Sequence, residues 1–206
     1  MRTHDSLLSR LGRWTAELLL VFLGAYAAFW LSNHQEHLQE AHRRQQILMA
    51  LEQSITTDIE SAKQQRDQQA IGLAAFKRAL DAGEMPLLKP LSFTSDYSAT
   101  DTATLLQSGG YQLLDVKTLV ALRGVESVLR GGISAIKHAQ DLSDALIVPN
   151  LDQDITFFYD PGTKQLRKRF SRYTAALESF QTFYNEYINA QADLLTQIRA
   201  ERQNTP

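Results

Sequence analysis

An uninterrupted apolar run, Leu18–Leu31, constrains the fold of this chain more than any other feature, because its fourteen residues contain no charge and no proline. As an α-helix the run rises only about 21 Å, which is shorter than a hydrocarbon core of roughly 30 Å. Extension to Trp14–Asn33 gives 20 residues, about the length that a bilayer requires, with Glu17 as the only charge. That carboxylate would lie near the polar edge, where a bilayer tolerates it. We therefore expect one transmembrane helix over residues 14–33.

Aromatic residues mark both ends of this span. Trp14 and Trp30 lie near its ends and Tyr26 lies between them, as in the aromatic belts of membrane helices. Two other interpretations remain open. The core of a soluble protein can hold a helix as apolar as this one, and a cleaved signal peptide would explain the A-x-A sequence at residues 25–27. Against cleavage, the apolar run continues past that site through residues 29–31.

Basic residues near the span indicate its orientation. Arg2, Arg10 and Arg13 precede it, whereas only two arginines follow within 20 residues, beside acidic side chains. Basic residues favour the cytoplasmic side of a membrane helix. We expect residues 1–13 to form a cytoplasmic or interfacial N-terminus and the bulk of the chain, beyond the span, to lie outside the cytoplasm.

Composition excludes several kinds of site. The 206 residues include no cysteine, which rules out disulfides, thiolate zinc sites, iron–sulfur clusters and cysteine nucleophiles. The 21 basic and 23 acidic side chains leave a formal charge of -2, so no global field attracts nucleic acid. We expect no catalytic residue, cofactor or metal, and no nucleic-acid partner.

Beyond the span, the sequence predicts an all-α protein. Residues 34–82 contain no proline and one glycine, and apolar side chains recur there at spacings of three and four, which predicts an amphipathic stalk helix, continuous with the span or separate from it. Gly83 and Pro86 would end this helix. We expect residues 83–100 to form a loop and residues 101–206 to form the remaining helices of an extracytoplasmic antiparallel bundle.

Local signals divide the second half of the chain. A short helix is predicted over residues 101–108, and another begins near Asp115 and meets a glycine pair at 131–132. We interpret the glycine pair as a helix end, beyond which the apolar pattern resumes in a second helix or in the same helix after a kink. The sequence Asp-Pro-Gly at 160–162 predicts a turn, preceded by a short extended piece over residues 155–159.

The C-terminal helix has the most regular pattern. From Leu166 onward, large side chains alternate spacings of four and three over more than four heptads, which predicts a packing seam for neighbouring helices. We expect Leu177, Phe180 and Tyr184 to be buried against the stalk helix or the helices of residues 116–147. The bundle seam consists of Phe170, Tyr173, Leu177, Phe180, Tyr184, Tyr187, Leu194 and Ile198.

Three groups of residues are candidates for binding. Histidines and acids between residues 34 and 42 have spacings that suit a metal ion, but polar residues just outside a membrane often serve solvation alone. A basic cluster would contact lipid phosphate or an acidic partner, or simply face solvent. Within the span, Gly24 and Ala28 allow close helix approach or merely fill space. The first two groups are His34, Glu36, His37, Glu40 and His42, and Lys164, Arg167, Lys168, Arg169 and Arg172.

The segment from Glu17 to Gly24, ELLLVFLG, followed by Ala28, Asn33 and Glu36, resembles the start of a family of uncharacterised bacterial single-pass membrane proteins. The stretch TLLQSGGYQLL, which begins at residue 104, is similar to that family's mid-chain Ser-Gly signature. The resemblance covers the anchor well and the remaining chain loosely, and a histidine replaces the family's tryptophan at residue 34. It implies an anchor in the bacterial inner membrane and a helical domain, and it implies no activity.

Together these features favour a membrane-anchored, non-enzymatic interaction protein, an accessory or scaffold subunit of a bacterial envelope complex. Its partners would be the lipid bilayer and a membrane protein or a second copy of the chain. The anchor residues are Trp14, Glu17, Gly24, Tyr26, Ala28 and Trp30. The alternative is an extracytoplasmic ligand-sensing helical bundle that signals through partner proteins, and an enzyme is the third candidate.

Overall fold

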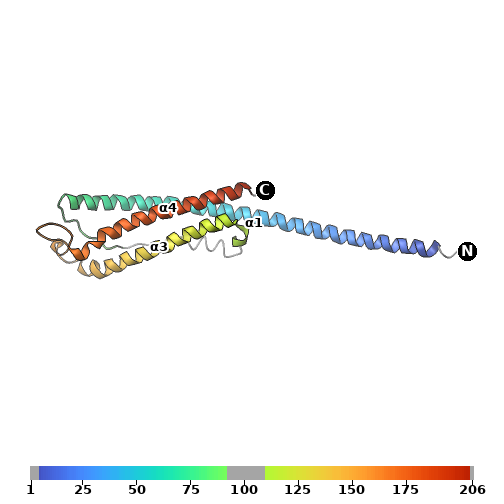
Figure 1. Ribbon diagram of the computed structural model, residues 1–206, viewed down its shortest axis with the longest axis horizontal. Helices are drawn as coiled ribbons and strands as arrows, with labels where there is room; N and C mark the ends of the chain where they lie inside the picture. The colour runs from blue at the N-terminus through green and yellow to red at the C-terminus, as the bar shows by residue number, and fades with distance from the viewer. Residues whose placement is uncertain (1–4, 92–109, 205–206) are drawn as a thin grey trace. The chain divides into compact units, whose positions relative to one another are not determined.

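The structure of the chain is a computed structural model that describes the backbone of residues 5–91 and 110–204. Side chains are described at Trp14, over residues 18–91 and over residues 110–204. This part of the chain is all-helical, as predicted (Figure 1). The helix predicted over residues 101–108 lies outside the described residues. The long helices are α1 (Asp5–Asp81), α3 (Val116–Leu146) and α4 (Arg172–Asn204), and the short 3-10 helices are η1 (Gly110–Leu113), η2 (Val148–Asn150), η3 (Ile155–Phe157) and η4 (Lys168–Phe170).

Helix α1 joins the predicted span and the predicted stalk in one element, because no proline interrupts its sequence. It ends as the sequence predicts, at Gly83, whose φ is 71°. The Gly83 N–H donates to the Leu80 carbonyl (3.0 Å) and the Glu84 N–H donates to the Ala79 carbonyl (2.9 Å). These two bonds satisfy the last carbonyls of the helix, and the positive φ suits a residue without a Cβ.

The chain divides after Gln46 into two compact units, and α1 contributes to both. In the N-terminal unit, every described side chain of α1 from Leu18 to Glu40 is exposed. In the second unit, which begins at Ile47, one face of α1 is buried at spacings of three and four, as an amphipathic helix requires. The buried side chains on this face are Ile47, Leu48, Leu51, Ile55, Ile59 and Ala62.

Within the second unit, α4 runs antiparallel to α1 (Figure 1). Near the C-terminus of α4, Arg199 and Arg202 pair with Glu52 of α1, at 2.8 Å and 2.5 Å. At the other end of α4, the Tyr173 ring lies 5.5 Å from the Phe76 ring of α1. Residue numbers therefore rise along one helix as they fall along the other, as in an antiparallel helix pair.

Helix α3 is also antiparallel to α4. The backbone N–H of Asp115, at the start of α3, donates to the Glu201 carboxylate near the end of α4 (3.0 Å). Gly132 in the middle of α3 lies against Phe183 of α4. Since α4 opposes both partners, α1 and α3 run in the same direction.

Aromatic side chains of α4 form a large part of the core of the bundle. Of the predicted seam, seven side chains are buried and Leu177 is half-buried against the core. Tyr187 lies deep in it, and burial raises the pKa of its hydroxyl to about 12. The buried members are Phe170, Tyr173, Phe180, Tyr184, Tyr187, Leu194 and Ile198.

The predicted start of the C-terminal helix at Leu166 is wrong. Leu166 pairs with Tyr159 in an isolated antiparallel bridge, and the Arg167 N–H donates to the Phe158 carbonyl (3.0 Å). Phe170 then lies in η4, and α4 begins at Arg172. The apolar spacing continued through these residues because both the bridge and the helix face the same core.

The predicted extended piece over residues 155–159 is mostly a 3-10 turn, η3. Asp154 caps this turn, because its carboxylate accepts the Thr156 N–H (2.9 Å). The predicted turn at 160–162 is confirmed, with the Asp160 carboxylate accepting the N–H groups of Gly162 (2.9 Å) and Thr163 (3.0 Å). These backbone donors hold the pKa of Asp160 below its usual value.

The interpretation of Gly131-Gly132 as a helix end is wrong, because α3 continues unbroken from Val116 to Leu146. The reason for a glycine differs between the two positions. A Cβ on Gly132 would overlap the buried Phe183 ring, whereas a Cβ on Gly131 would meet no atom within 4 Å. Gly132 therefore lets α3 and α4 approach closely, which periodicity along one helix does not reveal.

We expect Gly132→Ala to destabilise the bundle by about 1–3 kcal/mol, because overpacking displaces the Phe183 ring and outweighs alanine's better helix propensity. Gly131→Ala is the matched control and should stabilise the bundle by up to about 1 kcal/mol. Urea unfolding followed by circular dichroism measures both free energies. Changes of the same sign in the two variants would contradict close packing at Gly132.

Candidate functional site

The surface that distinguishes this chain is the stretch Leu18–Leu31 of α1, where apolar side chains cover all sides of the helix. Within Leu18–Leu31, the exposed fraction of the large apolar side chains ranges from 52 % at Leu31 to 74 % at Leu20. A soluble helix normally confines such side chains to one buried face. Contiguous exposed apolar surface usually marks a site of membrane or protein contact. This surface, residues 18–31, is called the apolar segment below.

The apolar segment is short. Among the residues whose placement the structure describes, no helix contains a stretch long and apolar enough to cross a membrane. The predicted span over residues 14–33 also includes Glu17, whose side chain lies outside the described residues. Trp14, Tyr26 and Trp30 are exposed, at 76 %, 69 % and 60 %.

The change from apolar to polar surface occurs within one turn of α1. The indole of Trp30 stacks on the imidazole of His34, with ring centroids 5.5 Å apart and planes 3° apart. From Asn33 to Glu40 all side chains are exposed, and all but Leu38 are polar or charged. An aromatic ring at such a boundary is typical of the interfacial ends of membrane helices.

The predicted histidine group does not form a cluster of ligands in the described part of the chain. Groups of three or more histidine and acidic side chains that could hold a metal ion are absent from the described residues. His42 instead shares a hydrogen bond with Gln46 one turn further along α1 (3.0 Å). His34, Glu36, His37 and Glu40 follow one another along the same exposed stretch of α1.

All five side chains of the predicted basic cluster are exposed, and two of them also contact the loop before α4. The Arg167 guanidinium donates to the Tyr159 carbonyl (2.9 Å) and the Thr156 carbonyl (3.1 Å). The Arg169 guanidinium lies 4.1 Å from the centroid of the Phe157 ring and 4.7 Å from that of Phe170. These two arginines fasten the loop before α4, which is a structural role that their spacing in the sequence did not indicate.

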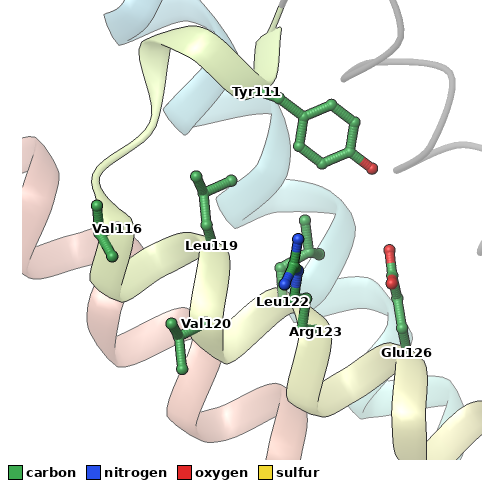
Figure 2. Close-up of a pocket in the computed structure, with 7 residues that line it drawn as sticks. All are labelled: Tyr111, Val116, Leu119, Val120, Leu122, Arg123 and Glu126. Atoms are coloured by element: carbon green, nitrogen blue, oxygen red, sulfur yellow. The ribbon is translucent and has the colours of Figure 1, made fainter.

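A hollow of about 550 Å³ lies between η1 and the first turns of α3. Figure 2 shows the Tyr111 side chain extending from η1 over the first turns of α3, with the side chains of Arg123 and Glu126 along the same stretch of that helix. Most residues that line the hollow are apolar, and two of them, Val116 and Val120, are 74 % and 64 % exposed. The lining residues are Tyr111, Val116, Leu119, Val120, Leu122, Arg123 and Glu126. Sequence reasoning missed this hollow, because it depends on how η1 folds back over α3.

Hydrogen bonds tie several polar side chains inside the bundle to structural partners, whereas the buried hydroxyl of Thr118 has no hydrogen-bond partner among the described residues. The Gln191 amide donates to the Tyr187 hydroxyl (2.7 Å), and the Tyr159 hydroxyl donates to the Pro86 carbonyl (2.5 Å). Burial raises the pKa of Tyr159 to about 12, and nearby Tyr173 contributes further. Both hydroxyls stay protonated at neutral pH and serve the packing of the bundle.

The chain matches no protein family, no curated protein and no solved structure in the comparisons. Its function must therefore be argued from the apolar segment and the bundle themselves.

Proposed function

We propose that this protein is a membrane-anchored, non-enzymatic interaction protein, an accessory or scaffold subunit of a bacterial envelope complex. The observation that carries the proposal is the apolar segment, which exposes large side chains on every side of α1. Water would penalise this surface at roughly 25 cal/mol for each Å². A bilayer removes the penalty, and a helix satisfies its own backbone hydrogen bonds there.

In this proposal residues 14–33 cross the membrane, with the Trp30–His34 stack at one interface. The sequence of the apolar segment, its resemblance to bacterial single-pass anchors and the polar residues that follow Asn33 support this placement. The bundle then lies outside the cytoplasm, where its partner would be a membrane protein of the envelope or a second copy of the chain.

The bundle supports an interaction role rather than catalysis. Several of its charged groups join helices, as Glu52 joins Arg199 and Arg202, and Lys77 pairs with Glu178 at 2.5 Å. Its aromatic side chains fill the core. A scaffold needs a folded body and an exposed contact surface. The ion pairs and the packed aromatic side chains provide the folded body.

The orientation of the anchor can be tested with reporters fused after Pro206. Because Arg2, Arg10 and Arg13 precede the span, we expect alkaline phosphatase at this position to be active and a strictly cytoplasmic reporter to be inactive. Enzyme activity in intact cells measures both. An active cytoplasmic reporter would reverse the orientation.

Association through the anchor can be tested at Gly24, which lies one turn from Ala28. A Cβ on Gly24 meets no atom within 4 Å, so leucine fits the helix itself. We expect Gly24→Leu to lower recovery of the associated partner or second copy at least threefold in mild detergent, because bulk there keeps helices apart. Leu19→Val is the mild control. Equal recovery from wild type and Gly24→Leu would assign association to the bundle.

The alternative, a ligand-sensing bundle, draws support from the hollow beside α3. A sensor would bind a small molecule there and change how the bundle meets its partner. Val120→Trp would fill the hollow. If this variant loses a partner while Gly24→Leu retains it, the sensing function is favoured over a simple anchor.

A further inference from the structure

The two halves of α1 within the bundle are attached to it in different ways. Residues 47–62, called the proximal half here, bury six apolar side chains, among them Leu48, which is fully buried, and Ile55, which is 1 % exposed. Residues 63–81, called the distal arm, are all described, and none of their side chains is buried. Fully buried apolar side chains on α1 therefore end at Ala62, although the helix continues for nineteen residues to Asp81 and Phe76 and Leu80 pack half-buried against the core.

Half-buried Phe76 and Leu80, together with a few polar contacts, hold the distal arm to the bundle. The Tyr184 hydroxyl donates to the Gln65 side-chain oxygen (2.8 Å), and the Gln181 amide donates to the Arg66 carbonyl (3.0 Å). Further along, Lys77 and Glu178 form an ion pair in which both side chains are nearly half exposed, at 46 % and 48 %. The two hydrogen bonds are partly buried and the ion pair is open to water, so each contributes less to stability than a fully buried apolar side chain.

The distal arm is bounded by two fixed points. The buried proximal half precedes it, and buried Leu88 follows it, close to Pro86, whose carbonyl accepts the Tyr159 hydroxyl. A helical stretch with few buried contacts between two well-anchored points is the kind of element that opens locally while the rest of a protein stays folded.

We infer that the distal arm of α1 is a strap that opens from the bundle as a local unit, while the proximal half and α4 remain packed. Opening would break the contacts to Tyr184 and Tyr173 and uncover this part of α4. The proximal half would keep the bundle joined to the N-terminal part of α1 throughout. The bundle thus has a second accessible state that exposes aromatic side chains suited to a protein partner.

Hydrogen exchange of the full chain in detergent micelles, resolved by peptide, tests the inference. We expect backbone amides of residues 66–80 to exchange at least tenfold faster than those of residues 50–62 and of residues 180–194, with little acceleration by subdenaturing urea. A difference below tenfold, or the same urea dependence in all three segments, would mean that α1 opens only with the whole bundle and would overturn the inference.

Two neighbouring glutamines provide a matched pair of variants. Gln69 is half-buried and Gln68 is exposed on the same turn. Gln69→Leu adds apolar contact between the strap and the bundle, so it should slow exchange over residues 66–80 at least threefold. Gln68→Leu has the same effect on helix propensity and should change the rate by less than a factor of two. Equal effects of the two variants would mean that helix propensity alone sets the exchange rates, which would contradict the strap.

Discussion

Truncation of Phe180 to alanine should destabilise the bundle by about 3–5 kcal/mol. The Phe180 side chain is 1 % exposed and lies at the middle of the α4 seam. Its removal deletes buried apolar surface and leaves a cavity that the surrounding aromatic side chains are too rigid to fill. Such a loss is a large fraction of the stability of a typical domain.

The control for this variant is Phe22→Ala, which makes the same chemical change at a position 66 % exposed in the N-terminal unit. It should change the stability of the bundle by less than about 0.5 kcal/mol. Guanidinium unfolding of both full-length variants in the same detergent gives the two free energies. A cost below 1 kcal/mol for Phe180→Ala, with the slope of the transition unchanged, would contradict a packed seam.

Placement of two arginines in the apolar segment should release the protein from membranes. Leu20 and Leu23 lie near the middle of the proposed span, where each leucine favours insertion and each arginine opposes it. We expect the double variant Leu20→Arg, Leu23→Arg to lose about 6–8 kcal/mol of insertion free energy. That change should move the protein from the carbonate-resistant membrane fraction to the soluble fraction or to inclusion bodies.

Leu38→Arg is the matched control, because Leu38 is 58 % exposed and follows the proposed span. It should leave the protein in the membrane fraction. Immunoblots of fractions after alkaline extraction compare the variants with wild type. Retention of the double arginine variant in the carbonate-resistant fraction would show that the apolar segment does not span the bilayer.

Local features of the fold were predictable because they depend on nearby residues. The hydrogen bonds that end α1 around Gly83 join residues no more than five positions apart in the sequence. The α4 seam follows the helical period, and Phe180 and Tyr184 are buried as that period predicts. Asp160 and the two residues after Pro161 form their turn without help from other elements.

Which helices pack together, and in which direction, could not be predicted from the apolar periodicity of the sequence. The pattern identifies the face of a helix that is buried but not the helix that covers it. Glu52 and Arg199 are far apart in sequence, and their pairing fixes a direction that the pattern leaves open. Gly132 is explained only by Phe183 on another helix. Leu166 fits the seam although it lies in a bridge, because strand and helix residues can face the same core.

The candidate surfaces also differ in whether they depend on contacts between elements. The apolar segment needs no tertiary contact to be recognised, because uninterrupted hydrophobicity is a property of the sequence itself. The hollow beside α3 depends on Tyr111 from η1 lying over that helix, so it could not be anticipated. The roles of Arg167 and Arg169 depend on the loop that they fasten.

Thiol accessibility in intact cells tests the membrane anchor most directly, since the chain has no cysteine of its own. Single cysteines would replace Phe22 in the apolar segment and Leu38 beyond it, and a maleimide requires a thiol in contact with water. We predict that Leu38→Cys reacts with a membrane-impermeant maleimide added outside the inner membrane. Phe22→Cys should react with neither an impermeant nor a permeant maleimide until detergent is added. Equal labelling of both cysteines in intact membranes would contradict the anchor and the function proposed from it.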